Sequence, residues 1–135
     1  FQKDEIIKKN IFIIPLLIIS NSESKASEFE KKMNKSVYSY TSIIDRLVEF
    51  NDSHEGDDLN ESQRIWVIQN NCAMKKSILR HFEFLLANID EYNRTYNFNE
   101  TKESIVEASL EDVEDYVEYS EELSKLGKTC EPSEN

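Results

Sequence analysis

Apolar side chains recur along this chain at three- and four-residue steps, the spacing of amphipathic α-helices. The first such pattern begins at Ser27 and Glu30, whose S-x-x-E spacing is that of a helix capping box, and it extends to about Phe50. The polar stretch NDSHEGDDLNES that follows predicts a loop, because charge and a glycine interrupt the periodicity. The predicted core face of this helix consists of Phe29, Met33, Val37, Tyr40, Ile44 and Leu47.

A second helix is expected from about Glu61 to Tyr92. Lys75 and Lys76 leave a weaker patch midway along its apolar stripe, and the sequence NRTYNFNE predicts the loop that ends it. The stripe consists of Ile65, Ile68, Cys72, Leu79, Phe82, Leu86 and Ile89, and it is widened by Trp66, Ile78 and Leu85.

A third helix is expected to start near Thr101, and Gly127 suits the left-handed residue that follows a helix. Ser109 and Asp112 have a second capping-box spacing, so a break near residue 108 is the alternative. The predicted apolar positions of this helix are Ile105/Val106, Ala108/Ser109, Val113, Tyr116/Val117 and Leu123.

These patterns predict an all-α fold, an antiparallel three-helix bundle with up-down-up topology, because short loops make neighbouring helices antiparallel. A fourth helix is expected if either the N-terminal apolar segment or a break near residue 108 adds one. With only 2 Gly and 2 Pro in 135 residues, the chain has few turn residues for a many-stranded sheet.

The most apolar segment is NIFIIPLLIISNSES, residues 10–24. Two lysines precede it, and Ser22 and Ser24 suit the −3 and −1 positions of a signal-peptidase site, which is the order of a secretory signal. We predict that residues 1–24 are a signal peptide and that residues 25–135 form a single helical domain. A buried element of the fold is the alternative. A membrane span needs about 20 apolar residues, so this run is too short.

The chain is acidic, with 27 Asp+Glu against 16 Lys+Arg and a formal net charge of −11. Such a field repels phosphate backbones and anionic lipid headgroups, so nucleic acid and electrostatic membrane binding are not expected. If the chain has a protein partner, a basic surface is the kind that this charge favours.

The chain has two cysteines, Cys72 and Cys130, which form no CxxC pair and, with two histidines, no plausible zinc set. Both lie about 30 residues from Phe98, the centre of the turn between the second and third helices, one before it and one after. At ~1.5 Å rise per residue, antiparallel helices bring them to similar heights. A Cys72–Cys130 disulfide is therefore feasible and is expected in an exported chain, whereas a cytosolic chain would keep two free thiols.

Five Asn-x-Ser/Thr sequons occur where about 1.7 are expected by chance from the composition. Four of them fall in or beside the predicted interhelical loops, where a glycan has room. An accidental excess in an Asn- and Ser-rich chain is the alternative. The predicted acceptors are Asn34, Asn51, Asn60, Asn93 and Asn99.

No motif predicts catalysis. The two histidines, His54 and His81, have no sequence context that resembles a nucleophile elbow. The loop from Asn51 to Ser62 matches an EF-hand frame in part, but Ser62 stands where the bidentate Glu is needed and Asn51 where Asp is usual. We therefore predict that the protein is not an enzyme and has no cofactor and no metal site.

Two further features each have a structural and a functional interpretation. In EDVEDYVEYSEE, residues 111–122, Tyr116 and Tyr119 are flanked by acids, so sulfation and binding of a basic surface are one interpretation. The favoured one is an exposed helix face with Val113, Tyr116 and Val117 turned inward. The aromatic residues of the second helix either fill the core or line a pocket for an apolar ligand; they are Trp66, Phe82, Phe84 and Tyr92.

Together these observations favour a small secreted, N-glycosylated helical protein that acts by binding another protein, either cytokine-like or as a host-directed effector. A helical carrier of a small apolar ligand such as a lipid is the second hypothesis. An intracellular structural or adaptor helix bundle is the third, and it gains support if the first apolar segment is buried in the fold.

Overall fold

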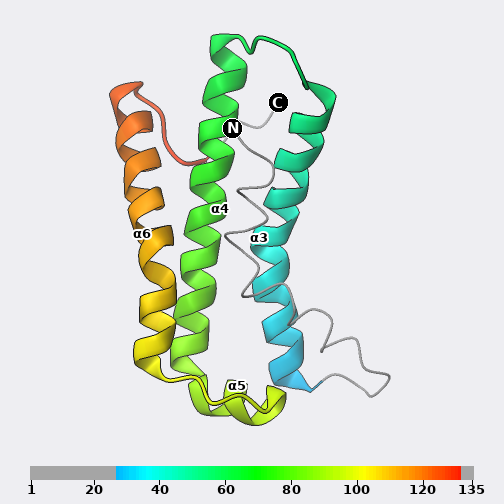
Figure 1. The fold of residues 1–135 in the computed structure, drawn as a ribbon, viewed down its shortest axis with the longest axis vertical. Helices are drawn as coiled ribbons and strands as arrows, with labels where there is room; N and C mark the ends of the chain where they lie inside the picture. Colours follow the sequence, from blue (N-terminus) through cyan, green and yellow to red (C-terminus); the bar gives the residue numbers. More distant parts are fainter. Residues whose placement is uncertain (1–26, 132–135) are drawn as a thin grey trace.

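Four α-helices make up the regular structure of residues 27–131, the part of the chain that the computed structural model describes. They are α3 (Glu28–Ser53), α4 (Glu61–Ala87), α5 (Ile89–Tyr96) and α6 (Lys102–Lys125). The three long helices stand side by side with alternating direction, and α5 lies across their lower end (Figure 1). The predicted all-α bundle is confirmed. The predicted signal peptide, residues 1–24, lies outside the described residues.

Each long helix begins with a reciprocal capping box. Ser27 Oγ accepts a hydrogen bond from the Glu30 amide at 3.1 Å, and the Glu30 carboxylate accepts one from the Ser27 amide at 3.1 Å. Thr101 begins α6 in the same way, and Asn60 begins α4. An N-cap side chain of this kind stabilises a helix by about 1 kcal/mol. The predicted starts at Ser27 and Thr101 are therefore confirmed.

The break in the helical pattern lies at Asn88 and not near residue 108, where α6 is continuous. Asn88 leaves helical geometry with φ −128°, and its side-chain amide donates to the Phe84 carbonyl at 2.9 Å. The predicted second helix is thus two helices. The predicted loop NRTYNFNE is also helical as far as Tyr96, where Asn97 ends α5 in the left-handed conformation with φ 56°.

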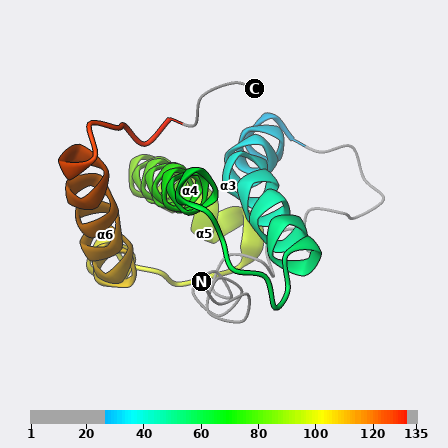
Figure 2. The same cartoon turned by 90° about the horizontal axis from the view of Figure 1, so that it is seen from above.

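Helix α4 lies between α3 and α6 and packs along both (Figure 2). Among the described helices, α3 and α6 do not pack closely against each other along their lengths. The core face predicted for α3 is confirmed, because all six of its residues are buried. Of the seven residues in the stripe predicted for α4, only Cys72 and Phe82 are buried, and the other five are partly exposed. Helix α4 packs on two sides and buries a wider face than a single stripe.

The buried circumference of α4 includes polar side chains that are satisfied locally. Asn70 and Asn71 donate to the carbonyls four residues earlier, each at 2.9 Å. Buried polar groups are tolerated when they are hydrogen-bonded in this way. Polar residues of α4 are therefore not always exposed to solvent, so the apolar pattern alone underestimates how much of this helix is buried.

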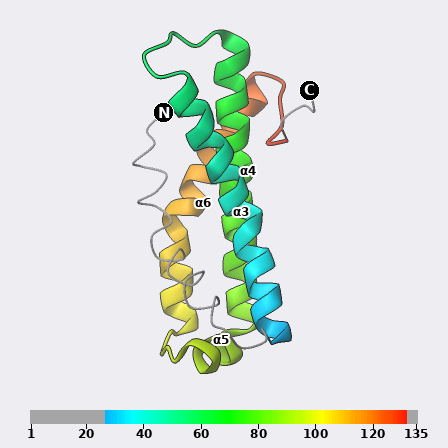
Figure 3. The ribbon, with the colours of Figure 1, turned by 90° about the vertical axis from the view of Figure 1, so that its right-hand side faces the viewer.

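Helix α5 closes the lower end of the bundle (Figure 3), and aromatic side chains gather there. Tyr92 and Tyr96 are buried, and the Tyr92 and Phe98 ring centroids lie 5.6 Å apart. Phe29 of α3 stacks on Phe84 of α4 at 5.6 Å. These rings fill the lower core, as the structural interpretation of the aromatic residues predicts.

Candidate functional site

Helix α6 is held against α4 by few apolar contacts. Three of its residues are buried, and one of them, Asp112, is an acid, so Ile105 and Leu123 are its buried apolar residues. Helix α3 buries seven residues, all apolar or aromatic. Because hydrophobic stabilisation scales with the apolar area removed from water, it attaches α6 less firmly than α3.

An ion cluster joins the middle of α6 to α4. Lys75 Nζ donates a hydrogen bond to Asp112 Oδ1 at 2.7 Å and lies 3.1 Å from Asp115 Oδ2. The Lys75 side chain is 1% exposed and that of Asp112 is 7% exposed. Burial raises the pKa of Asp112, and the hydrogen bond and charge of Lys75 offset part of that rise. We refer to Lys75, Asp112 and Asp115 as the clamp.

The upper end of α6 is tied to α4 through the segment that follows it. Gly127 ends the helix with φ +68°, as predicted, and the chain then turns back towards α4. Cys130 comes within disulfide-bonding distance of the buried Cys72, with 5.2 Å between their Cα atoms. The Gln69 side-chain amide donates to the carbonyls of Thr129 and Glu131 at 3.1 and 3.2 Å. The predicted pairing of the cysteines is thus confirmed at the level of distance.

Helix α6 leaves its most regular apolar stripe exposed. Val106, Leu110, Val113 and Val117 are 46%, 58%, 42% and 47% exposed. Their spacing of four, three and four residues places them on one helix face, roughly a third of a turn from the buried face. We refer to these four residues as the α6 seam.

The seam corrects one prediction from the sequence. Val113 and Val117 were expected to turn inward, but both are exposed, while Ile105 and Leu123 are buried as predicted. The clamp lies on the face of α6 that is turned to α4, because Asp112 and Asp115 reach Lys75 there, and the seam lies on another face. The apolar pattern of α6 by itself offers two faces and does not select between them.

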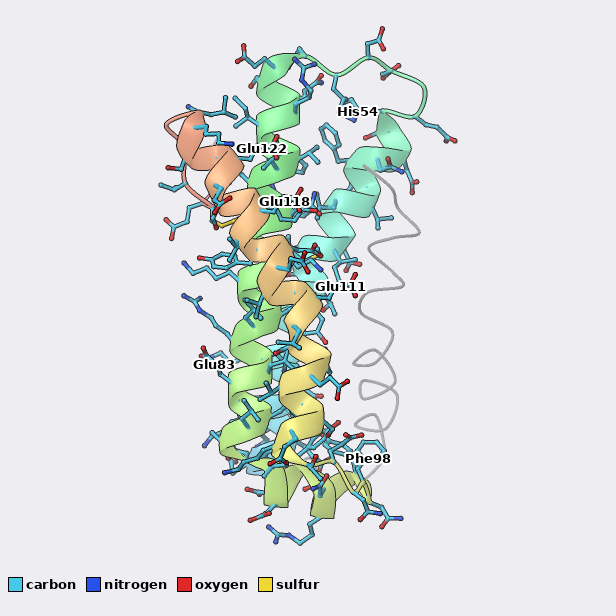
Figure 4. The ribbon with its side chains drawn as sticks, turned by 60° about the vertical axis from the view of Figure 1, so that its left-hand side comes forward. His54, Glu83, Phe98, Glu111, Glu118 and Glu122 are labelled. Carbon is cyan, nitrogen blue, oxygen red and sulfur yellow. A yellow bond between two sulfur atoms is a disulfide. The ribbon has the colours of Figure 1, made fainter. Side chains whose placement is uncertain are left out.

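Glutamates border the seam on the side that points away from α4. Glu107, Glu114 and Glu121 follow one another at seven-residue intervals, and all three are exposed. Helix α6 carries nine carboxylates and two lysines in total. Figure 4 shows acids distributed along the helix and labels Glu111, Glu118 and Glu122. The candidate site is therefore an apolar seam beside an acidic row, on a helix that the clamp joins to α4.

The five predicted glycan acceptors occupy different kinds of position. Asn93 is the most constrained, because its side-chain amide donates to the Glu100 carbonyl at 2.8 Å and its oxygen accepts from the Glu100 amide at 3.0 Å. Asn60 and Asn99 are exposed, whereas Asn34, Asn51 and Asn93 are partly buried. Asn93 lies within α5 rather than in the loop expected there.

The two histidines have separate surroundings. His81 is buried in the core, where Ser36 Oγ and His81 Nδ1 lie 2.8 Å apart, and Nε2 has no hydrogen-bond partner among residues 27–131. Burial lowers the pKa of His81 to about 4, so the ring is neutral at pH 7. The His81 side chain is 0% exposed, whereas Ser36 is partly buried. His54 stacks on Phe50 at the end of α3 (Figure 4).

The described chain is thus an all-helical bundle with an exposed apolar seam on α6, and its two cysteines lie at disulfide-bonding distance between α4 and the C-terminal segment. Comparison with protein-family models, with curated proteins and with solved structures finds no match. Within residues 27–131, no helix has the length and apolar character needed to cross a membrane. The same residues contain no group of three or more His, Cys, Asp or Glu that could hold a metal ion.

Proposed function

We propose that this chain is a small secreted, N-glycosylated helical protein that acts by binding another protein, in the manner of a cytokine or a host-directed effector, and not by catalysis. The observation that carries the binding function is the exposed α6 seam. Scattered single apolar residues are ordinary on a surface, but four on one helix face form a contiguous patch of the kind that marks interaction sites.

Export is supported by the cysteine pair and by the sequence. A disulfide persists in oxidising compartments and is rare in reducing ones, and Cys72 and Cys130 lie at disulfide-bonding distance. The basic, apolar and small-residue order of residues 1–24 and the five sequons point to the same compartment. The intracellular adaptor alternative lacks a comparable reason for the cysteine pair.

The proposal that the chain is secreted can be tested by measuring the intact mass of the protein made by a eukaryotic secretory host. We expect cleavage near Ser24, added glycan mass, and the two-dalton loss of one disulfide, all on the same product. The Cys130→Ala variant is the matched control for the disulfide. An uncleaved, unglycosylated and reduced product would contradict secretion and favour the intracellular bundle.

The proposal that the chain binds another protein through the α6 seam can be tested by measuring how the secreted product binds to cell surfaces. Leu110→Gln with Val113→Gln removes the centre of the seam and keeps helix-forming residues there, while Tyr38→Gln changes a side chain that is 68% exposed on α3. All three positions are exposed, so stability should change little. We expect the seam variant to lose binding and the Tyr38 variant to keep it. Equal binding by both would contradict a role for the seam.

A carrier of a small apolar ligand is the second candidate, and one observation favours it. A hollow of about 590 Å³ lies beside Ile65 and Trp66, between the start of α4 and the C-terminal segment. Its volume is in the range of small-molecule sites, although Gln69 and two glutamates share its lining. Native mass spectrometry of the secreted product checks this candidate. A stoichiometric co-purified lipid that Trp66→Ala abolishes would favour it over protein binding.

A further inference from the structure

We propose that the partner of the α6 seam is a basic amphipathic helix, which packs its own apolar stripe on the seam and pairs its lysines or arginines with the acidic row. This inference rests on the proposed protein-binding function and specifies the chemistry of the partner. It is carried by the register of the seam, by the charges beside it and by the rigidity of α6.

The register of the seam is that of a coiled-coil contact. Val106, Leu110, Val113 and Val117 alternate steps of four and three residues, as the a and d positions of a heptad do. From Val106 to Val117 the seam is about 17 Å long at ~1.5 Å per residue, which matches about two heptads of a partner helix. A second helix is therefore the element whose side chains interdigitate with this spacing.

The flanking charges select the sign of the partner. In the same heptad frame, Glu107, Glu114 and Glu121 occupy the e positions, which in coiled coils set partner choice through salt bridges. All three are exposed glutamates. A partner with Lys or Arg at the facing positions completes charge pairs, whereas an acidic partner meets like charges, which are destabilising.

Charge also argues against two occupants supplied by the chain itself. In an antiparallel contact, a second copy would place its own Glu107, Glu114 and Glu121 opposite these glutamates. In either orientation the contact would join two copies of a helix with nine carboxylates and two lysines, which repel each other. The apolar run of residues 11–19 contains no lysine or arginine to pair with the acidic row. Both remain outcomes of the test below.

Helix α6 is fixed before a partner arrives. The clamp holds its middle, and the disulfide and the Gln69 bonds hold the segment that follows its end. A preorganised surface loses little conformational entropy on binding, which favours affinity. The contacts that hold α6 are therefore already made before the seam meets a partner helix.

Two synthetic helical peptides of about three heptads, with identical leucines at a and d, probe the inference. One carries Lys at all e and g positions and the other carries Glu there, so neither peptide pairs with itself. Fluorescence anisotropy with the secreted product should show binding of the Lys peptide at low salt, and on the order of tenfold weaker binding of the Glu peptide.

Variants of the protein show where the Lys peptide binds. Leu110→Gln with Val113→Gln should weaken binding on the order of tenfold or more, and Tyr38→Gln should leave it unchanged. Glu107→Lys with Glu114→Lys should reverse the preference in favour of the Glu peptide. Asp45→Lys with Glu49→Lys, a matched charge change at exposed positions of α3, should not reverse it.

A photo-reactive residue at position 110 identifies the occupant directly. Crosslinks to the Lys peptide support the proposal, whereas crosslinks to a second copy of the chain, or to residues 11–19 in protein that retains them, overturn it. Equal affinity for the two peptides, or binding of neither, also overturns the basic-helix inference. The proposed function is judged separately by the mass of the secreted product and by seam-dependent cell binding, so it can survive that result.

Discussion

Lys75→Met should be among the most damaging single substitutions in this protein. Methionine fills a similar volume but removes the positive charge. The buried Asp112 carboxylate then loses its ion-pair partner, and Asp115 loses its contact with Lys75. Breaking a buried ion pair by removing one partner costs about 3–5 kcal/mol. Since small domains are stable by only about 5–15 kcal/mol, this is a large share of the total.

Urea unfolding followed by circular dichroism measures this cost at pH 7. With a slope of about 1–3 kcal/mol per M, the midpoint should fall by at least about 1 M. Lys35→Met is the matched control, because Lys35 is exposed on α3 and a surface change there should stay within about 0.5 kcal/mol. The cost should shrink as the pH falls below 7, because burial raises the pKa of Asp112 and an unpaired carboxyl relieves its penalty by taking a proton.

A double variant distinguishes two effects: the loss of the ion pair itself, and the cost of leaving one buried charge without a partner. Replacing a buried ion pair by apolar residues of similar volume is often close to neutral, so Lys75→Met with Asp112→Leu should recover most of the lost stability. If Lys75→Met costs less than about 1 kcal/mol at pH 7, or if the double variant is the worse of the two, the clamp does not fix α6 by buried charge pairing.

Three further predictions concern the core, the cross-link and the sequons. The pKa of His81 is about 4 in the folded protein and about 6.5 in the unfolded chain, so its protonation lowers the free energy of unfolding by about 3 kcal/mol between pH 6.5 and pH 4. The free energy of unfolding of the wild type relative to His81→Phe should decline over that range, and a constant difference would contradict this. Cys130→Ala opens a cross-link with a sequence separation of 58, and should cost about 4 kcal/mol and make the urea midpoint insensitive to a reducing agent; no loss on substitution or reduction would mean that no bond forms. Asn93→Ala should cost about 1–3 kcal/mol, because two hydrogen bonds to Glu100 are lost, while Asn99→Ala should be nearly neutral in unglycosylated protein; equal effects would contradict this role of Asn93.

The helix starts were predictable because their chemistry is local. A capping box spans only four residues, and the pair Ser27 and Glu30 is one that can be read directly from the sequence. The start of α6 was predicted near Thr101, where the apolar pattern resumes, and the helix begins there. The core face of α3 was predictable for a similar reason, since it packs on one side only and its apolar period is clean. The break at Asn88 was not, because no glycine or proline marks it.

The clamp and the seam depend on residues far apart in the sequence. Asp112 lies 37 residues from Lys75, so no local pattern in α6 announces the pairing. A usable signal was present in α4, where Lys75 falls in phase with the core residues Cys72 and Phe82. A lysine at such a position is rarely buried unless it is paired, so it predicts an acidic partner on a neighbouring helix.

The clamp also raises the question of which face of α6 would be buried without it. Ile105 and Leu123 are its buried apolar residues, whereas the exposed seam has four in a more regular row. Burial of apolar area alone would favour turning the seam towards α4. We therefore hypothesise that the clamp fixes the rotation of α6, a use of buried charge for specificity that holds in some proteins and not in others.

Cysteine labelling tests this hypothesis. Val113→Cys should react rapidly with iodoacetamide in the otherwise wild-type protein, since Val113 is 42% exposed. In the Lys75→Met, Asp112→Leu background, a rotated α6 would bury position 113 and slow the reaction, although the fold remains stable. Equal reactivity in both backgrounds would show that the seam faces solvent without help from the clamp. The acidic row would then be the feature of α6 that distinguishes its binding face.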